Sequence, residues 1–412
     1  MSLESFSSRY YECPTKEDLK KEYVGKEINE LPFPAFVLDR KIFTNNCNRM
    51  LDRVDEIGLT FRPHVKTHKT LEGTLIQLGN GRSKAVVVST LREAFALIPL
   101  FQQGMLEDVL YGLPIAKSRL QELYELSKIV PHLRLMIDHP DQLALLKTFS
   151  KGVSLRKPWS IFIKLDMGTK RAGVTTDSET LHQIIQSILA DRETLHLFGF
   201  YCHAGHSYAC KNIEKASEYL FCEVDAANKA TEFAMSIDST LSLTMSVGAT
   251  PTAHSVSPQL KKLFPKLKGK LEVHAGNYPI CDVQQMFTNC IKQENISGSV
   301  VAEVLSVYPS RNGQPGEVLI NAGVIALSRE PSPEGGFGII TTSGYESFYV
   351  DRLSQEHGIL RSKDPNAVLS TVGEILRIIP NHSCITASAF PWYYVINGSD
   401  TVVDIWIPWK GW

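Results

Sequence analysis

The chain has 412 residues, a length that predicts more than one domain. Hydrophobic residues make up 43% of it and charged residues 21%, which is the composition of an ordinary soluble globular protein. The 43 basic and 44 acidic residues are well mixed, and this balance argues against nucleic acid and membrane surfaces as partners. There is no signal-peptide core and no apolar run of membrane-spanning length, so we expect a cytoplasmic protein with reduced, scattered cysteines.

Strand and helix patterns alternate between residues 59 and 277. The spacing predicts eight strands, at 59–65, 85–90, 108–113, 133–138, 159–166, 197–203, 243–249 and 271–277. Helical patterns lie between them at 71–78, 91–103, 116–129, 140–149, 178–190 and 212–237, with a weaker one at 258–267. Eight strands separated by helices predict an α/β fold in the form of a (β/α)8 barrel. A doubly wound open sheet is the competing architecture, but no Gly-x-Gly-x-x-Gly follows an early strand.

The character of the sequence changes after about residue 295. Strand-like segments at 300–308, 318–327, 337–342, 345–350, 371–380, 384–389 and 393–406 predict a C-terminal all-β domain. We therefore expect three parts, which are an N-terminal segment (1–32) that packs on the β domain, a barrel (33–294) and the β domain (295–412). A short helix is expected near residues 16–22. The proline-containing stretch near 32–38 is expected to be extended and could pair with the β domain.

The run FRPHVKTHKT at residues 61–70 ends the first predicted barrel strand. Alternate residues of a strand share a face, so four basic or titratable side chains are expected to point the same way, namely Arg62, His64, Lys66 and His68. Neighbouring cations favour the neutral amine of a lysine, which makes Lys66 a candidate nucleophile beside a bound anion. One alternative is a solvated basic loop. Another is a metal site at the two histidines, but their spacing differs from the His-x-His of metallohydrolases.

Polar clusters follow five of the predicted strands, at the end where (β/α)8 barrels bind their ligands. They are Lys66, DMGTKRAGV (166–174), YCHAGHSY (201–208), SVGATPT (246–252) and HAGNY (274–278). Glycine and small hydroxyl residues after strands seven and eight offer backbone donors and close approach to a phosphate. Each cluster alone could be an ordinary turn, but five at one barrel mouth predict a binding site.

A lysine beside a phosphate-binding loop is suited to holding pyridoxal phosphate (PLP) as a Schiff base. The expected contacts are the 246–252 run, Gly276 and Asn277 with the phosphate, Arg171 with the phenolic oxygen, Tyr201 with the ring nitrogen and Tyr208 with the phosphate. No carboxylate is an obvious partner of the ring nitrogen. Without such a partner PLP would be a weaker electron sink than usual, so a second electrophile could assist the reaction.

The second electrophile is predicted in the β domain, at His382 and Cys384. On a strand, His-x-Cys places an imidazole and a thiolate on one face, and both groups are zinc ligands. Two protein ligands would leave positions for water or substrate. The spacing alone also fits an ordinary core histidine and cysteine. A further polar cluster at 354–358 could line the same site or form a dimer contact.

Together these motifs resemble the eukaryotic D-serine dehydratases, which are PLP- and zinc-dependent ammonia-lyases with the alanine-racemase-like fold (fold type III). The resemblance is carried by RPHVKTHKT, DMGTKRAGV, GFYCHAGHSY, SVGATPT, HAGNY, SQEHGIL and NHSCIT, in this order from residue 61 to about residue 388. It implies that Lys66 carries the cofactor, that the other cofactor contacts are Tyr201, Tyr208, Thr250, Gly276 and Asn277, and that the zinc ligands are His382 and Cys384. The cofactor contact expected of Arg171 is inferred from its place in the motif as much as from the resemblance. The fold type implies a homodimer.

The resemblance implies β-elimination of D-serine to pyruvate and ammonia. Lys66 would remove the α-proton, and zinc would accept the β-hydroxyl group. Two lyase alternatives stay open, a D-threonine aldolase-like enzyme and a D-threo-3-hydroxyaspartate dehydratase-like enzyme, although D-threonine aldolases carry an acid where Cys384 stands. A non-catalytic PLP-binding protein is an alternative of another class, but such proteins resemble the barrel alone.

Overall fold

The computed structural model describes residues 14–412 and divides the chain into two compact units. The barrel unit holds Asn46–Tyr278, Phe287–Ile291 and Trp409–Trp412, and the β unit holds the described residues up to Asn45 together with Pro279–Met286 and Lys292–Pro408. These units differ from the contiguous parts expected with boundaries at residues 33 and 295. The reason is that strand β1 (Ala35–Asp39) pairs with strands of the β unit.

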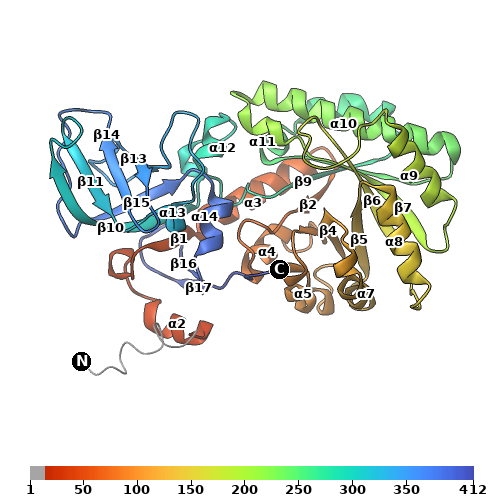
Figure 1. Ribbon diagram of the computed structural model, residues 1–412, viewed down its shortest axis with the longest axis horizontal. Helices are drawn as coiled ribbons and strands as arrows, with labels where there is room; N and C mark the ends of the chain where they lie inside the picture. The colour runs from red at the N-terminus through yellow and green to blue at the C-terminus, as the bar shows by residue number, and fades with distance from the viewer. Residues whose placement is uncertain (1–13) are drawn as a thin grey trace. The chain divides into compact units, whose positions relative to one another are not determined.

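The barrel unit contains eight parallel strands, as expected (Figure 1). They are β2 (Thr60–Pro63), β3 (Ala85–Val88), β4 (Asp108–Pro114), β5 (His132–Ile137), β6 (Trp159–Leu165), β7 (Leu195–Cys202), β8 (Thr244–Val247) and β9 (Lys270–Ala275). Their order is β2-β9-β8-β7-β6-β5-β4-β3, and a parallel bridge between His64 and Val87 joins the two ends. The backbone N–H of Val65 also donates to Val87 O (3.1 Å). The predicted (β/α)8 barrel is therefore confirmed.

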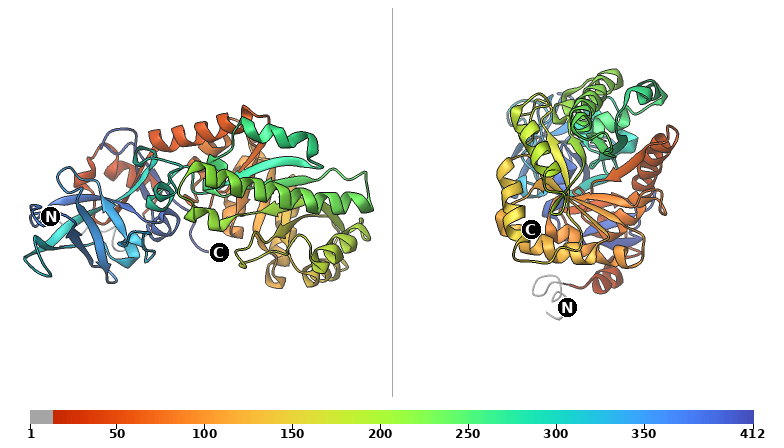
Figure 2. Two further views of the ribbon diagram at one scale, coloured as in Figure 1. Left: turned by 90° about the horizontal axis from the view of Figure 1, so that it is seen from above. Right: turned by 90° about the vertical axis from the view of Figure 1, so that its right-hand side faces the viewer.

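Helices cover the outside of this sheet (Figure 2). They are α4 (Leu71–Leu78), α5 (Leu91–Ala96), α6 (Ile98–Gln102), α7 (Leu120–Ile129), α8 (Pro140–Ser150), α9 (Glu179–Leu189), α10 (Ile213–Ile237) and α11 (Thr250–His254), with 3₁₀ turns η3 (Lys117–Arg119), η4 (Gly205–Ala209) and η5 (Pro258–Lys266). Several begin at hydroxyl caps, which satisfy backbone donors left open at a helix start. Thr70 and Thr90 cap α4 and α5 in this way. Helix α3 (Arg40–Asp55) precedes β2.

Strands β7 and β8 approach each other closely at Gly199, which is paired with Thr244. A Cβ atom at Gly199 would lie 1.8 Å from Thr244 O. We expect Gly199→Ala to lower the free energy of unfolding by about 1–3 kcal/mol, because backbone must move to make room. Urea unfolding of the cofactor-loaded protein measures this. The matched control is Gly152→Ala, whose Cβ would meet only Phe149 O at 3.6 Å, and equal midpoints for both variants would contradict the expectation.

The β unit contains one nine-stranded sheet. Its strands are β1, β10 (Gly298–Pro309), β11 (Gly316–Ile320), β12 (Gly338–Ile340), β13 (Phe348–Leu353), β14 (Gly358–Ser362), β15 (Ile375–Pro380), β16 (Tyr393–Ile396) and β17 (Asp404–Trp406). Antiparallel pairing runs β10-β11-β14-β13-β12-β15 and returns to β10, so these six strands close on themselves. Strand β1 pairs antiparallel with β10 on one side and parallel with β16 on the other. The predicted all-β domain is thus confirmed.

The described part of the N-terminal segment packs on this sheet. Helix α2 (Lys16–Tyr23) buries Leu19 and Tyr23 in a cluster with Val37, Val301 and Tyr394. The rings of Tyr23 and Tyr394 meet edge to face with centroids 5.1 Å apart. A 3₁₀ turn, η2 (Ile28–Glu30), leads into β1. The expectation that residues 1–13 also pack on the β domain lies outside the described residues.

Two segments predicted as strands contain helix instead. Residues 384–389 lie in α14 (Ser383–Ala389), and the end of the 318–327 segment forms α13 (Val324–Leu327). The start of α14 is stabilised from far along the chain, because Asp282 Oδ2 accepts from the backbone N–H of Ser383 (2.9 Å). The local preference for a strand is therefore outweighed by a helix cap that comes from a distant part of the chain. Two further short elements in this part of the chain are α12 (Val283–Phe287) and η6 (Gln293–Asn295).

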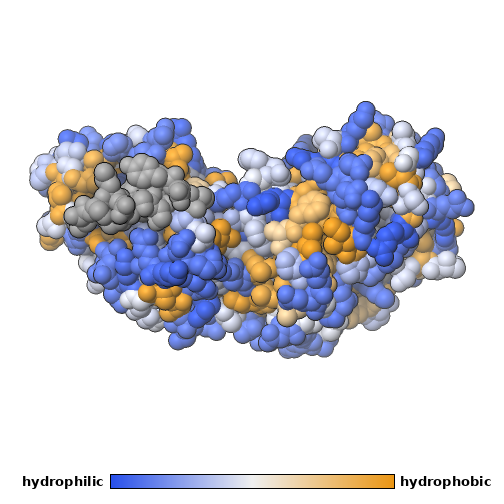
Figure 3. All heavy atoms as spheres, turned by 90° about the horizontal axis from the view of Figure 1, so that it is seen from below, coloured by the Kyte–Doolittle hydropathy of each residue, from blue (hydrophilic) through white to orange (hydrophobic). Residues whose placement is uncertain are grey.

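Among the described residues, no helix combines the length and the apolar character needed to cross a membrane. On the face shown in Figure 3, hydrophobic residues form separate groups between hydrophilic ones.

Candidate active site

Lys66 lies just beyond β2, on the loop that leads into α4. Its backbone N–H donates to His64 Nδ1 (3.3 Å). Its side chain lies against the loop after β9, since a Cβ atom added at Gly276 would stand 3.1 Å from Lys66 Cε. Thr67 Oγ1 donates to Gly276 O (3.3 Å) and ties the two loops together. A side chain at residue 276 would therefore crowd the side chain of Lys66, and glycine avoids this contact.

Arg62 and His68 lie apart from Lys66, whereas His64 lies beside it, against Gly276. Arg62 is buried inside the barrel, where its guanidinium donates to both carboxylate oxygens of Glu272 (2.8 and 3.2 Å) and to Asp108 Oδ1 (2.6 Å). His68 is fully buried and hydrogen-bonds to a glutamine of α4. The predicted row of four side chains is wrong, because the strand ends before Lys66 and the chain turns there.

Hydrogen bonds connect this buried ion pair with the mouth of the barrel. Ser246 Oγ donates to Glu272 Oε1 (2.7 Å) and lies 3.0 Å from His274 Nδ1. The ring of His274 stacks on that of Tyr201, with centroids 4.0 Å apart and planes 9° from parallel. Tyr201, near the end of β7, is therefore held in one ring orientation by neighbours that are themselves fixed.

Charged and titratable side chains meet around Lys66. Burial lowers the pKa of Lys164, on β6, to about 8, and the positive charge of Arg171 lowers it as well. Burial, together with the charges of Lys164 and Lys66, lowers the pKa of His203 far below its ordinary value. His203 is therefore neutral at pH 7. Arg171 is exposed, but its charge reaches both Lys164 and His203, which places it in this neighbourhood.

The loops after β8 and β9 are joined at their backbones. The N–H of Asn277 donates to Thr250 Oγ1 (3.1 Å), and Thr250 is fully buried. Gly248 has φ +144°, and a Cβ there would lie 2.0 Å from His274 O, so only glycine fits this crossing. His203 Nδ1 donates to Gly248 O (2.8 Å) and adds the β7 loop to the same assembly.

The structure thus brings six predicted site residues to the C-terminal ends of β2, β7, β8 and β9. They are Lys66, Tyr201, Tyr208, Thr250, Gly276 and Asn277. Tyr208 is half-buried in η4, with its ring centroid 6.4 Å from that of His203. The roles of these residues toward a cofactor stay predictions.

Glu223 is a site residue that the sequence did not reveal. It lies in α10 and is fully buried, and its Oε1 accepts from the backbone N–H of Ala204 (2.6 Å). Thr252 and Gly248, in the loop after β8, lie close enough to its carboxyl group to influence its pKa. The side chain therefore bonds to the loop after β7 and lies next to the loop after β8. Burial outweighs these contacts and raises the pKa of Glu223 to about 7.

This raised pKa predicts a pH-dependent stability. Between about pH 4.5 and 7 the unfolded chain loses the Glu223 proton while the folded chain keeps it, so stability falls as pH rises through this window. A shift from 4.5 to about 7 corresponds to about 3 kcal/mol. The amide oxygen of Glu223→Gln can still accept from the Ala204 N–H, but it does not titrate, so we expect the variant to lose this fall in stability. Urea unfolding at pH 5 and pH 8 measures the free energy of unfolding of both proteins. An equal fall in wild type and variant would contradict the expectation.

The predicted metal ligands lie at the start of α14 in the β unit. His382 is the residue before the helix, and Cys384 lies in its first turn. The two side chains are within hydrogen-bonding reach of each other, although they do not lie on a strand as predicted. The helix start brings them together instead, and Asp282 fixes that start by accepting from Ser383 N–H.

Acidic groups surround the imidazole of His382. Glu330 Oε2 hydrogen-bonds to His382 Nδ1, and the charge of Asp282 also reaches the ring. Burial lowers the pKa of His382, but Cys384, Asp282 and Glu330 outweigh it and raise that pKa to about 10. Such surroundings favour a cation. Among the residues that the structure describes, however, no three His, Cys, Asp or Glu side chains are arranged to hold a metal ion, and the role of His382 and Cys384 as ligands stays a prediction. Glu330 and Asp282 are neighbours that sequence reasoning did not find.

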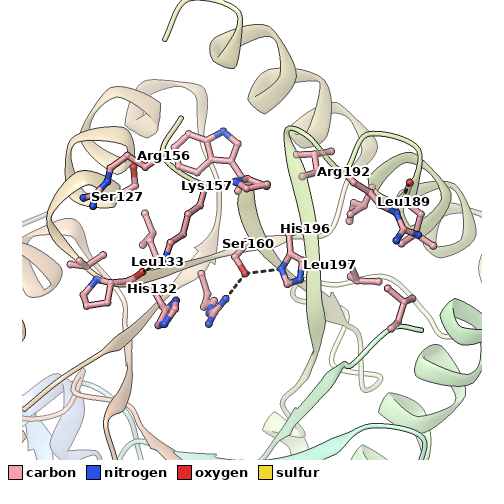
Figure 4. A pocket seen from close by; sticks show the side chains of 18 of the residues that line it. Ser127, His132, Leu133, Arg156, Lys157, Ser160, Leu189, Arg192, His196 and Leu197 are labelled. Atoms are coloured by element: carbon pink, nitrogen blue, oxygen red, sulfur yellow. Dashed lines mark hydrogen bonds between the residues drawn. The ribbon is translucent and has the colours of Figure 1, made fainter. Parts of the chain in front are cut away.

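A cavity of about 630 Å³ lies at the other end of the barrel strands (Figure 4). His132, Ser160 and His196 line it, near the N-terminal ends of β5, β6 and β7, and Ser160 Oγ accepts from Arg134 Nη1 (2.6 Å). In (β/α)8 barrels this end serves stability, whereas catalysis occurs at the C-terminal ends. None of the predicted site residues lines this cavity.

Two known sequence families match the chain. Residues 38–257 match "Alanine racemase, N-terminal domain", and residues 297–396 match "Putative serine dehydratase domain". The chain is 66% identical over 412 residues to the D-serine dehydratase of Schizosaccharomyces pombe, a match that covers 100% of this chain and 99% of that protein. The chain belongs to the D-serine dehydratase family. The family member from Saccharomyces cerevisiae is 38% identical, with 96% of this chain and 100% of that protein covered.

Solved structures resemble this family member over nearly its whole length. D-threo-3-hydroxyaspartate dehydratase from Delftia sp. HT23 superposes with a TM-score of 0.82 at 28% identity, covering 94% of this chain and 100% of that chain. Two further structures are of variants of that enzyme, in which a histidine or a cysteine two positions away is replaced by alanine. The cysteine variant is in a metal-free form.

Proposed function

We propose that the protein is a lyase that converts D-serine to pyruvate and ammonia. The observation that carries this proposal is the meeting of Lys66, Tyr201 and the joined loops after β8 and β9 at one end of the barrel. Membership of the D-serine dehydratase family supports the choice of substrate and reaction.

PLP is the proposed cofactor of the barrel. Lys66 would hold it covalently, and Thr250, Gly276 and Asn277 would hold its phosphate. Two features fit such a group. Gly276 leaves free the space next to Lys66 Cε, and the buried Nε2 of His274 has no hydrogen-bond partner among the described residues. The other proposed contacts are Tyr201, Tyr208 and Arg171.

Zinc is the proposed metal of the β unit, with His382 and Cys384 as ligands. Imidazole nitrogen and thiolate sulfur are donors that zinc prefers. Glu330, hydrogen-bonded to Nδ1, would orient the imidazole and leave its Nε2 for the metal. The spacing of the two residues equals that of the histidine and cysteine replaced in the Delftia enzyme, whose cysteine variant is metal-free. With two protein ligands, positions stay open for water and the substrate hydroxyl group.

When bound, PLP supplies an electron sink for the charge that develops at Cα, and zinc supplies a Lewis acid for the leaving hydroxyl group. The side chains of the protein handle protons and orientation. The amine of Lys66 removes the α-proton of D-serine. Tyr201, stacked on His274, keeps its ring fixed beside the reacting group. Loss of the hydroxyl group gives 2-aminoacrylate, which water hydrolyses to pyruvate and ammonia.

Product analysis distinguishes this function from its alternatives. A dehydratase forms a 2-oxo acid and ammonia from D-serine, and also from any D-threonine or D-threo-3-hydroxyaspartate that it accepts. An aldolase instead cleaves Cα–Cβ and releases acetaldehyde and glycine from D-threonine. A PLP-binding protein without activity forms neither. Acetaldehyde without 2-oxo acid, or no product from the PLP-loaded protein, would overturn the proposal.

We also propose that the protein acts as a homodimer in the cytoplasm, with a small D-amino acid as its substrate and no nucleic acid or membrane partner. These statements rest on the family's fold type and on the balanced composition. Light scattering on the eluting protein measures the mass, for which a dimer of 46.0 kDa chains is expected.

A further inference from the structure

Two cysteines of the barrel unit lie next to each other although they are far apart in the sequence. Cys210 follows η4, and Cys290 lies in the short segment Phe287–Ile291. Their sulfur atoms lie 3.9 and 3.7 Å from the same carbonyl oxygen, that of Thr288, and the two thiols are within hydrogen-bonding reach of each other. Asn289 Nδ2 donates to Lys211 O (2.9 Å), so the two segments are also joined by a contact that does not involve sulfur.

The two thiols differ in accessibility and acidity. Cys210 is buried, whereas Cys290 is partly exposed. The adjacent Cys210 thiol, the contact with Thr288 and the charge of Arg53 lower the pKa of Cys290, against the effects of burial and of Glu214. The adjacent Cys290 thiol in turn raises the pKa of Cys210. Cys290 is therefore the thiolate that an oxidant reaches first, and Cys210 is positioned to react next.

We propose that Cys290 and Cys210 form a redox modification site at which a peroxide closes a disulfide between η4 and the 287–291 segment. In the first step the Cys290 thiolate attacks hydrogen peroxide, forming a sulfenic acid and releasing hydroxide, which takes up a proton to become water. In the second step the sulfur of Cys210 attacks the sulfenic sulfur, the S–O bond breaks, and the Cys210 proton leaves with the hydroxyl group as water. Two thiols have then lost two electrons, and one peroxide has become two waters.

The position of Cys210 links this modification to the candidate active site. Its backbone N–H donates to Ser207 O (3.0 Å) at the end of η4, the turn that carries Tyr208. A disulfide draws two sulfurs to about 2.0 Å, closer than hydrogen-bonded thiols. We therefore expect η4 to shift and Tyr208 to move with it. This consequence rests on the proposed function, whereas the formation of the disulfide does not.

Mass spectrometry of the PLP- and zinc-loaded protein tests the site. After treatment with hydrogen peroxide, we expect the intact mass to fall by two hydrogen atoms and a non-reduced digest to contain a Cys210–Cys290 peptide. Dithiothreitol should reverse both changes. In Cys210→Ser the sulfenic acid should persist and react with dimedone at Cys290, and in Cys290→Ser neither product should form. Cys222→Ser is the matched control and should behave like wild type, because Cys222 is an exposed cysteine on α10, away from the proposed pair.

No cross-link, or a cross-link that uses other cysteines, would overturn the proposed site. Activity gives the second readout. We expect oxidation to lower kcat/KM for D-serine at least about tenfold in wild type and in Cys222→Ser, but not in Cys290→Ser. A disulfide that leaves kcat/KM unchanged would overturn the link to η4. A protein that forms the disulfide but never acts on D-serine would refute the proposed function and leave the modification site standing.

Discussion

Lys66→Ala is expected to lower the turnover of D-serine by about 10²–10⁴-fold, the usual contribution of a positioned acid–base group. The side chain of Lys66 lies against Gly276 at the mouth of the barrel, beside the joined loops that are proposed to hold the cofactor phosphate. The variant also loses the amine that would hold PLP, so borohydride treatment should no longer fix the cofactor to the peptide that contains residue 66. Steady-state kinetics and peptide mapping measure the two effects separately.

Lys84→Ala is the matched control for that variant. Lys84 pairs with Glu107 (2.5 Å) in an exposed ion pair near the N-terminal ends of the strands, far from the predicted site residues. An exposed pair of this kind contributes little to stability. We expect full turnover and normal labelling at residue 66. Wild-type turnover by Lys66→Ala, or borohydride labelling at another lysine, would refute the role given to Lys66.

His382→Ala and Cys384→Ser are expected to lower elimination by about 10²-fold or more while PLP stays bound, because each removes one of two proposed zinc ligands. The barrel unit carries the proposed PLP contacts and is unchanged in both variants. Elemental analysis of the purified proteins should show that zinc is lost. Cofactor absorbance should match that of the wild type.

Val368→Ala is the control for the metal variants. Val368 is an exposed residue of the same β unit, between β14 and β15, and belongs to none of the motifs that the sequence singled out. We expect wild-type zinc content and turnover. If His382→Ala keeps both its zinc and its activity, the metal lies elsewhere. Loss of zinc without loss of activity would show that zinc takes no part in the reaction.

The barrel could be predicted from the sequence because its pattern is local and repeats. Buried strands alternate with helices, and several of these helices begin at a hydroxyl cap, such as Thr70 before α4 and Thr90 before α5. The polar residues that end β7, β8 and β9 could be found for the same reason, since the fold fixes at which end of the sheet they lie.

The features that sequence reasoning missed depend on contacts between distant parts of the chain. The start of α14 depends on Asp282, which is 101 residues from the Ser383 N–H that it accepts. Glu223 lies in the middle of a long amphipathic helix, and nothing in its local sequence distinguishes it from a surface carboxylate. Arg62 follows the same sequence alternation as Lys66, but in the fold it pairs with the buried Glu272 and the partly buried Asp108. Pattern reasoning finds periodic elements, but pairings of this kind require the folded structure.

Pyruvate release from D-serine and from L-serine, by the PLP-loaded protein before and after zinc removal, tests the central claim most directly. The account predicts pyruvate from the D isomer alone, loss of release when a chelator removes zinc, and recovery when zinc is returned. Release from L-serine at a similar rate, or undiminished release from the metal-free protein, would contradict it.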